Sequence, residues 1–100
     1  GHTLVVSKNH YEILTDVPKE VLQKLVVVVQ KVAAAVVKAT NAEGFNILMN
    51  NKEVAGQLVP HAHFHIVPRF AGDGLKLHWE HQEYREKEIE EYREKIKELI

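Results

Sequence analysis

Three histidines occupy alternate positions within residues 61–67: His61, His63 and His65. Successive side chains of a β-strand point to opposite faces, so this pattern predicts three imidazoles on one face, about 6–7 Å apart. The apolar residues between and after them point the other way, into a core; these are Ala62, Phe64 and Ile66. A row of imidazoles with this spacing could border a group the size of a tetrahedral phosphate.

Three kinds of role fit such a row, and the spacing alone leaves them open. The histidines could form a polar strand face, although three titratable rings on one face repel each other when they are protonated. They could bind zinc, because neutral imidazole is a common zinc ligand. They could also act on a phosphoryl centre, with the middle ring as nucleophile and its neighbours donating hydrogen bonds to the anionic oxygens.

The composition excludes several other classes of site. The chain has 100 residues and no cysteine, which excludes disulfide frameworks, Cys-ligated zinc and thiol nucleophiles. Its net charge of −1 argues against a nucleic-acid-binding protein, and its apolar stretches are too short to span a membrane. Because no segment is typical of a signal peptide, we expect a cytoplasmic protein.

The elements that must position the histidines fit a small α+β domain. The length allows one domain over residues 1–100, with a core at 1–81 and a charged C-terminal helix at 82–100. Strands are expected at 3–7, 45–49 and 61–67, with Pro68 ending the last of them. Turns or loops are expected at 8–10, 50–53 and 71–74.

A helix is predicted over residues 17–40, because polar residues recur at helical spacing through an otherwise apolar segment. Thr15 and Asp16 offer an N-cap, Pro18 fits the first turn, and the residues from Asn41 to Gly44 suit a helix end. The apolar arc of this helix is wider than one sheet requires. We therefore expect it to be buried on two sides, against the sheet and against a partner subunit.

Residues 82–100 are predicted to form a strongly charged helix with a solvated face. Its apolar residues form a narrow seam; they are Ile89, Tyr92, Ile96 and Leu99. Pairs such as Glu83–Lys87 and Glu91–Lys95 would stabilise it by about 0.2–0.5 kcal/mol each. Residues 80–100 contain eight Glu and five Lys or Arg, so they carry −3, whereas residues 1–79 carry +2.

The histidine strand resembles the signature of the histidine triad (HIT) family of nucleotide hydrolases and transferases. The residues from His61 to Val67 match its alternation of histidines and apolar residues, with Ala62 a small residue at the first apolar position. The resemblance covers nearly the whole chain. It includes the first strand and its following histidine (1–6 and 8–10), the strand before the site (44–50), the approach Gly56-Gln57, and the exit Pro68-Arg69 found in the dinucleoside polyphosphate hydrolase branch.

The resemblance implies catalytic roles for the three histidines. His63 would attack the α-phosphorus of a nucleotide and form a nucleotidyl-histidine, which water then hydrolyses. His61 and His65 would bind the phosphate oxygens and assist proton transfer. The uridylyltransferase branch of the family carries glutamine at the position of His65, so the resemblance favours a hydrolase.

The resemblance also implies a HIT-like fold, further site residues and a substrate class. Asn50 and Gln57 would contact the phosphate or the leaving group, and His10 would orient the triad. The substrate would be a nucleoside phosphoramidate or a dinucleoside polyphosphate, with a purine base, and no cofactor would be required. The alternatives are a catalytically weak nucleotide-binding module and a zinc site held by the histidines.

Family members usually carry a few dozen further residues, including a hairpin, before the position of Gly1. Without them a sheet edge and apolar surface would be exposed, so we expect a homodimer through helix 17–40. His2 is expected to be structural. The segment 78–81, His-Trp-Glu-His, is expected to pack around Trp79, with a second metal or substrate cluster as the alternative.

Overall fold

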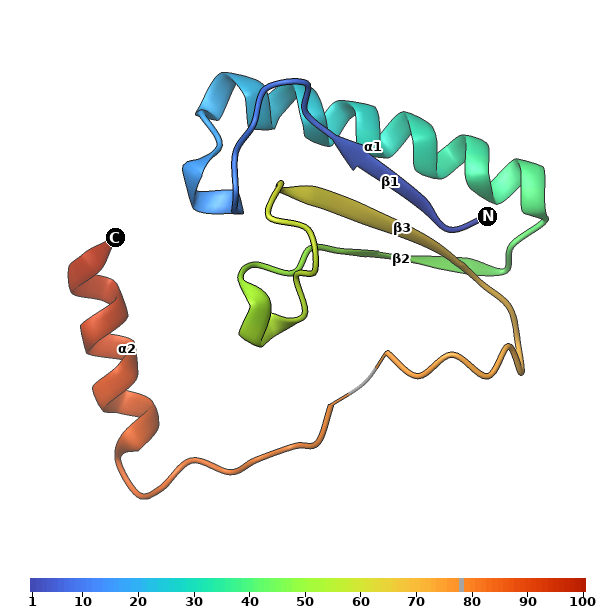
Figure 1. Cartoon of the computed structure of the whole chain (residues 1–100). Coiled ribbons are helices and arrows are strands. Elements are labelled where there is room, and N and C mark those ends of the chain that lie inside the picture. Colours follow the sequence, from blue (N-terminus) through green and yellow to red (C-terminus); the bar gives the residue numbers. More distant parts are fainter. Residues whose placement is uncertain (78) are drawn as a thin grey trace.

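The computed structural model describes residues 1–77 and 79–100. Its elements follow the chain in the order β1 (Thr3–Val6), the 3-10 helix η1 (Leu14–Asp16), α1 (Lys19–Thr40), β2 (Gly44–Leu48), the 3-10 helix η2 (Glu53–Ala55), β3 (His63–Arg69) and α2 (Glu88–Leu99) (Figure 1). The expected α+β architecture is confirmed, because a small antiparallel sheet carries one packed helix and a second helix follows it in the chain.

The histidine strand β3 is the central strand of a three-stranded antiparallel sheet with the order β1–β3–β2. His65 lies opposite Leu4 of β1 and Leu48 of β2, and His63 lies opposite Val6. Directly opposed residues of antiparallel strands point to the same face of the sheet. His65 therefore lies between apolar side chains of both neighbouring strands, and His63 lies on the same face beside Val6, beyond the last paired residue of β2.

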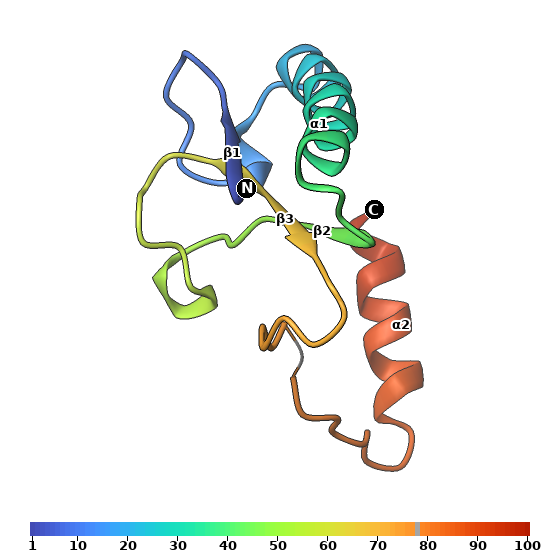
Figure 2. The same ribbon diagram turned by 90° about the vertical axis from the view of Figure 1, so that its right-hand side faces the viewer.

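Helix α1 covers the other face of the sheet, as Figures 1 and 2 show. The buried cluster between them consists of Val5, Val17, Leu25, Val29, Ala33, Ala62 and Ile66. Ile66 is completely buried, whereas Leu4 and Val6 on the histidine face are 53% and 52% exposed. The alternation of β3 thus separates a packed face from an accessible one, as the sequence predicts.

The observed strand β3 is shifted by two residues from the prediction. It begins at His63 rather than at residue 61, and it runs through Pro68 to Arg69. Pro68 does not end the strand, because β1 pairs only as far as Ile66 and β2 alone continues beside Pro68. A proline that lacks its N–H is tolerated where one side of the strand has no hydrogen-bonding neighbour.

The ends of helix α1 differ in how well the sequence predicts them. Thr15 and Asp16 belong to η1 and do not cap α1; Pro18 occupies the N-cap position, and it has no side-chain donor or acceptor for capping. At the other end Asn41 adopts a left-handed conformation with φ 56°, and its N–H donates to the carbonyl of Val37. Asparagine tolerates this conformation better than most residues, so the predicted helix end is confirmed.

Helix α1 is buried on one side in the single chain. Leu25, Val29 and Ala33 face the sheet, whereas Val26 and Val27 are about half exposed. A groove of about 500 Å³ runs between α1 and β2; it is lined mainly by Val29, Ala33, Ala34, Val37, Phe45 and Ile47. The expected burial of α1 against the sheet is therefore confirmed, and its burial against a partner subunit stays a prediction.

The second helix, α2, is shorter than the predicted range 82–100. Residues 82–87 are not helical, and Lys87 at the N-cap has a positive φ of 65°, so Glu83 and Lys87 do not face each other across a helical turn. Within residues 82–100 the structure records one ion pair, Arg93–Glu94 at 3.4 Å. Without packing against the body of the protein, the intrinsic propensity of these residues extends the helix only from Glu88 to Leu99.

No helix within the ranges 1–77 and 79–100 is both long enough and apolar enough to cross a lipid bilayer.

Candidate functional site

His63 has a fixed tautomer. It is 8% exposed, and its Nδ1 lies 2.6 Å from the carbonyl oxygen of His61. A carbonyl only accepts, so Nδ1 must carry the proton and donate it. In the neutral ring this leaves the lone pair on Nε2, which is the nitrogen that can act as a nucleophile.

His61 lies just before β3, where the backbone leaves the sheet. The N–H of Ala62 donates to the carbonyl of Tyr11 at 2.6 Å. The Nε2 of His61 lies 2.9 Å from the carbonyl oxygen of Ser7, to which it donates. The ring of His10 packs edge-on against that of His61, with centroids 5.1 Å apart. His10 therefore contacts the first histidine of the triad directly, and His61 reaches the second through its own carbonyl.

His65 lies close to two other histidines. Its ring centroid is 4.8 Å from that of His63, and its Nδ1 is 2.9 Å from Nε2 of His2. Partial burial lowers the pKa of His65, and the positive charges that His63 and His2 carry when protonated lower that pKa further. At neutral pH His65 is therefore neutral and carries one N–H. If His2 donates the proton of the bond between them, Nδ1 of His65 accepts and its Nε2 carries the N–H; if His65 donates, the N–H is on its Nδ1.

His2 is the site residue that the sequence interpretation missed. It was expected to be structural, yet it forms a hydrogen bond with His65. A signal is present in the strand pairing: Leu4 lies opposite His65, and residues two apart on a strand point to the same face. Once β1 is paired with β3 in this register, His2 must approach His65.

Asn50 lies beside the histidine face. It lines a groove of about 400 Å³ together with Asn46, Ile47, Leu48, Leu77 and Trp79. Because Leu48 lies opposite His65 in the sheet, this groove adjoins the triad. The amide Nδ2 of Asn50 has one long contact of 3.5 Å, to the carbonyl of Gly56, so much of its hydrogen-bonding capacity is available to a ligand.

Gln57 is buried and connects two loops through their main chains. Its Oε1 accepts from the N–H of Lys52 at 2.7 Å, and its Nε2 donates to the carbonyl of Glu12 at 2.6 Å. An ion pair between Lys52 and Glu12 at 3.3 Å lies over the same contact. Direct contact of Gln57 with a phosphate, as predicted, would compete with these main-chain bonds.

The other histidine-containing segment, 78–81, contributes no packed cluster. His78 lies outside the described residues, and Trp79 is 81% exposed. The expectation that this segment packs around Trp79 is therefore wrong, because most of the indole is accessible to solvent. Among the residues that the structure describes, no three His, Asp or Glu side chains come together as ligands for one metal ion.

The arrangement suits attack on an anionic, electrophilic centre. The ring of His63, with a free Nε2, lies beside the ring of His65 on a sheet face with apolar walls, and the carbonyl of His61 holds its Nδ1 proton. Donors held by the protein stabilise negative charge without the reorganisation that water would need.

Comparison with known proteins connects this arrangement to one family. The family model described as "HIT domain" matches residues 1–72. An uncharacterized HIT-like protein of Methanocaldococcus jannaschii is 49% identical over 74% of this chain and 57% of its own length. An adenosine 5'-monophosphoramidase of Saccharomyces cerevisiae is 37% identical over 83% of this chain and 51% of its own length.

Solved structures show the same likeness in three dimensions. The crystal structure of SMU.412c from Streptococcus mutans matches with a TM-score of 0.89 at 38% identity, over 98% of this chain and 62% of that one. The chain spans about half the length of the curated relatives that it matches.

Proposed function

This chain belongs to the HIT family, and from that membership and the geometry of its histidines we propose that it is a nucleotide hydrolase acting at the α-phosphorus. The proposed reaction passes through a nucleotidyl-histidine on His63. The observation that supports it best is the 2.6 Å hydrogen bond from Nδ1 of His63 to the carbonyl of His61, because it leaves Nε2 as the nucleophilic nitrogen.

The proposed reaction has two displacements. In the first, Nε2 of His63 forms a bond to the α-phosphorus, and the bond from phosphorus to the leaving group breaks with its electron pair, which takes up a proton. In the second, water attacks the phosphorus and gives up a proton, which replaces the proton that the leaving group took up; the P–N bond breaks with its electron pair returning to Nε2, and His63 is restored. Splitting one difficult displacement into two easier steps is the benefit of covalent catalysis.

The neighbouring histidines are proposed to serve the phosphate oxygens and the proton. His65 can present an N–H to a developing negative charge, whereas His61, whose Nε2 already donates to the carbonyl of Ser7, can do so only when its Nδ1 is protonated as well. The lowered pKa of His65 keeps it ready to accept or pass on a proton near neutral pH. His10 is proposed to orient His61 through the contact between their rings.

Two side chains are proposed to act next to the triad. Asn50 would contact the phosphate or the leaving group from the groove beside Leu48. Gln57 would act indirectly, by holding the loops around Lys52 and Glu12 in place, and direct contact with the phosphate is the role that the family resemblance implies for it.

A nucleoside phosphoramidate with a purine base is the proposed substrate class. The yeast relative is named an adenosine 5'-monophosphoramidase, which supports a P–N bond as the bond that is cleaved. A dinucleoside polyphosphate is the second candidate, because Pro68-Arg69 follows the triad as in the branch of the family with that activity.

The test is intact-protein mass spectrometry after a brief acid-free quench with adenosine phosphoramidate. We expect an added nucleoside monophosphate on the peptide that contains His63, and loss of both the adduct and turnover in His63→Ala. His81→Ala removes an exposed histidine outside the site and serves as the matched control with unchanged turnover. Absence of the adduct during active turnover would exclude the covalent mechanism.

The alternatives are separated by two further outcomes. A catalytically weak nucleotide-binding module would bind a nucleoside monophosphate in calorimetry yet show no turnover that depends on His63. A zinc-dependent mechanism would lose its activity on exhaustive chelation and regain it with zinc. We expect activity to survive chelation, because the proposed steps use imidazole alone.

We also propose that the chain forms a homodimer through α1. Support comes from the apolar groove between α1 and β2 and from the half-exposed Val26 and Val27. A small domain that exposes this much apolar surface gains stability when a second copy covers it.

A further inference from the structure

Arg69, the last residue of β3, joins the histidine face of the sheet to the segment that follows it. His65 and Arg69 are four residues apart on one strand, so their side chains point to the same face. The guanidinium of Arg69 donates to both carboxylate oxygens of Asp73, at 2.8 Å from Nε and 3.1 Å from Nη2. It also donates to Oδ1 of Asn46 in β2 at 2.8 Å and to the carbonyl of Leu75 at 2.9 Å. One side chain thus joins β2 to the turn after β3.

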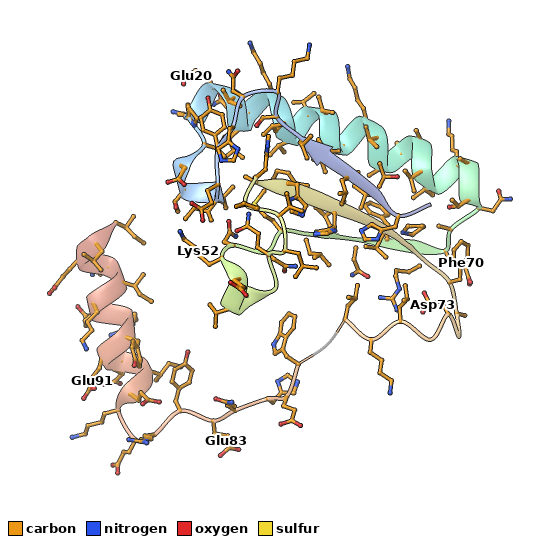
Figure 3. All side chains as sticks on the ribbon, viewed as in Figure 1. Glu20, Lys52, Phe70, Asp73, Glu83 and Glu91 are labelled. Atoms are coloured by element: carbon orange, nitrogen blue, oxygen red, sulfur yellow. The ribbon has the colours of Figure 1, made fainter. Side chains whose placement is uncertain are left out.

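Asp73 fixes the shape of that turn, residues 70–75. Its Oδ2 accepts from the N–H of Phe70 at 3.1 Å, and its Oδ1 accepts from the N–H of Leu75 at 3.0 Å. Figure 3 shows Phe70 and Asp73 at this turn. The side chains of Arg69 and Asp73 are only 26% and 14% exposed. The turn is therefore held in one shape by bonds that are largely removed from solvent, and Arg69 holds it against the sheet.

The turn directs the chain back toward the face of the sheet that carries the histidines. In Figures 1 and 2 the segment after β3 runs on the side of the sheet away from α1. Two residues after Leu75, this segment reaches the groove of about 400 Å³ beside β2, which Leu77 and Trp79 line together with residues of that strand. Asn46, the β2 partner of Arg69, lines the same groove. Arg69 is therefore bonded to one wall of the groove and to the turn that leads into the other wall.

We propose that Arg69 is a positioning residue for substrate binding, which acts through Asp73 and Asn46 to hold Leu77 and Trp79 at the groove. Arginine suits this role because its planar fork can bind both oxygens of one carboxylate and still present further N–H groups to other acceptors. Lysine would keep the positive charge but not the fork, so the two residues are not interchangeable here.

The groove is proposed to hold an organic part of the substrate next to the triad. Leu48, which lines the groove, lies opposite His65 in the sheet. The lining combines apolar side chains with the amide groups of Asn46 and Asn50, and such a lining fits a planar group with polar edges. In a nucleoside phosphoramidate this group is either the base or an aromatic amine that leaves. The proposal therefore rests on the proposed function and adds the residue that keeps the groove in shape.

The first test compares KM and kcat in Arg69→Lys and Asp73→Asn, with Asp16→Asn as the matched control away from the groove. We expect KM to rise at least about tenfold in both variants at the groove, because a displaced wall misplaces the bound substrate, and kcat to stay within about threefold. A merely structural role would lower the fraction of folded enzyme, and so the maximal rate, without changing KM. Circular dichroism measures that fraction, and that result would overturn the proposal.

Two substrates identify the group that the groove holds. Adenosine phosphoramidate releases only ammonia, whereas its N-benzyl derivative releases an aromatic amine. An increase of KM for both substrates in Arg69→Lys assigns the base to the groove, and an increase confined to the N-benzyl derivative assigns the leaving group. An unchanged KM for both substrates would overturn the proposal.

The second test uses Trp79, which is the only tryptophan of the chain. In a His63→Ala background the same two substrates can be titrated without the proposed covalent step, and their binding is followed by the indole emission. We expect at least one of them to change that emission, and we expect Arg69→Lys in this background to weaken its binding at least about tenfold. Equal affinity and an equal emission change with and without Arg69→Lys would contradict the positioning role.

These outcomes are distinct from a failure of the proposed function. Turnover that survives His63→Ala would overturn the nucleotidyl-histidine, whereas the KM of Arg69→Lys would still decide the role of Arg69. A nucleotidyl-histidine that forms normally, together with an unchanged KM in Arg69→Lys and Asp73→Asn, would overturn the positioning role alone. A chain that binds neither substrate would overturn both.

Discussion

At the scale of single residues, the chemistry of the site depends on where each imidazole keeps its proton. The proton of His63 is fixed by the carbonyl of His61, two residues earlier and just before the strand, so the proposed nucleophile is prepared by local backbone geometry. The proton of His65 is shared with His2, which directly precedes the neighbouring strand β1. The protonation of His63 is thus set locally, whereas that of His65 depends on strand pairing.

We predict that His2→Ala raises the pKa of His65. The protonated His2 lowers that pKa by charge repulsion, so its removal brings the value back toward the ordinary 6.5. The acid limb of the activity profile should move to higher pH, because His65 becomes charged earlier as the pH falls. An NMR titration of the His65 ring measures the shift directly, with His81→Ala as the control; an unchanged titration would mean that the two rings are not coupled.

At the scale of elements, the loops around the triad are joined by side chains that bind main chain. Gln57 connects the loop after β1 to the loop after β2. Arg69, at the end of β3, connects Asn46 of β2 to Asp73 and to the carbonyl of Leu75. The bonds of Gln57 join two loops that are distant in the sequence, and the bonds of Arg69 join β2 to the turn that follows β3. Each set of bonds therefore fixes the position of a strand end.

We predict that Gln57→Ala lowers the free energy of unfolding by about 1–3 kcal/mol, because it leaves the N–H of Lys52 and the carbonyl of Glu12 without their partner. Urea unfolding measures the change. Leu58→Ala is the matched control, since Leu58 is 90% exposed and its truncation should change stability little. Full stability in Gln57→Ala with lost turnover would instead favour direct contact between Gln57 and the substrate.

We predict that Asp73→Asn removes an acid-sensitive contribution to stability. Hydrogen bonds from Arg69, Phe70 and Leu75 hold the pKa of Asp73 well below its usual range, and Figure 3 shows Asp73 in the loop after β3. A carboxyl group whose pKa is lowered by folding stabilises the folded state at pH values above its pKa in the unfolded chain, about 3.9. This stabilisation is lost as the pH falls below that value toward the lower pKa of the folded state. The free energy of unfolding should therefore fall less steeply as the pH decreases below about 3.9 in Asp73→Asn than in the control Asp16→Asn, measured by urea unfolding followed by circular dichroism at a series of pH values.

At the scale of the whole molecule, two apolar surfaces remain accessible in the single chain. One is the groove between α1 and β2, and the other is the seam of α2. Together with the thin core around Ile66, they support the homodimer that we propose.

We predict that Ala34→Glu dissociates the homodimer. The substitution places a charge within the groove that we propose as the interface, and burial of an unpaired charge is strongly unfavourable. Light scattering over a dilution series measures the molar mass of the protein in solution and so distinguishes the dimer from the monomer. Ala35→Glu is the matched control, because Ala35 is exposed on α1 and does not line the groove; equal loss of the dimer in both variants would place the interface elsewhere.

Much of the fold could be predicted because it follows from local patterns. The alternation in 61–67 predicts which side of β3 is buried, and the helical spacing in 17–40 predicts α1 to within two residues at its start. The ends of the elements were harder to predict. Pro68 remains in β3 because β1 stops pairing at Ile66, and where that pairing stops depends on a strand that is distant in the sequence. The range 82–100 was predicted as one helix because its composition favours a helix throughout, although its first residues have no packing to hold them.

The sequence by itself determined the face on which His63 and His65 lie, because strand alternation is set within a few consecutive residues, and its resemblance to the HIT family pointed to His63 as the proposed nucleophile. Only the tertiary structure decided the partners of the other imidazoles: His2 reaches His65, and His10 reaches His61. Such contacts join residues more than 50 positions apart. Their geometry depends on the register between strands, and a periodicity along one strand carries no information about that register.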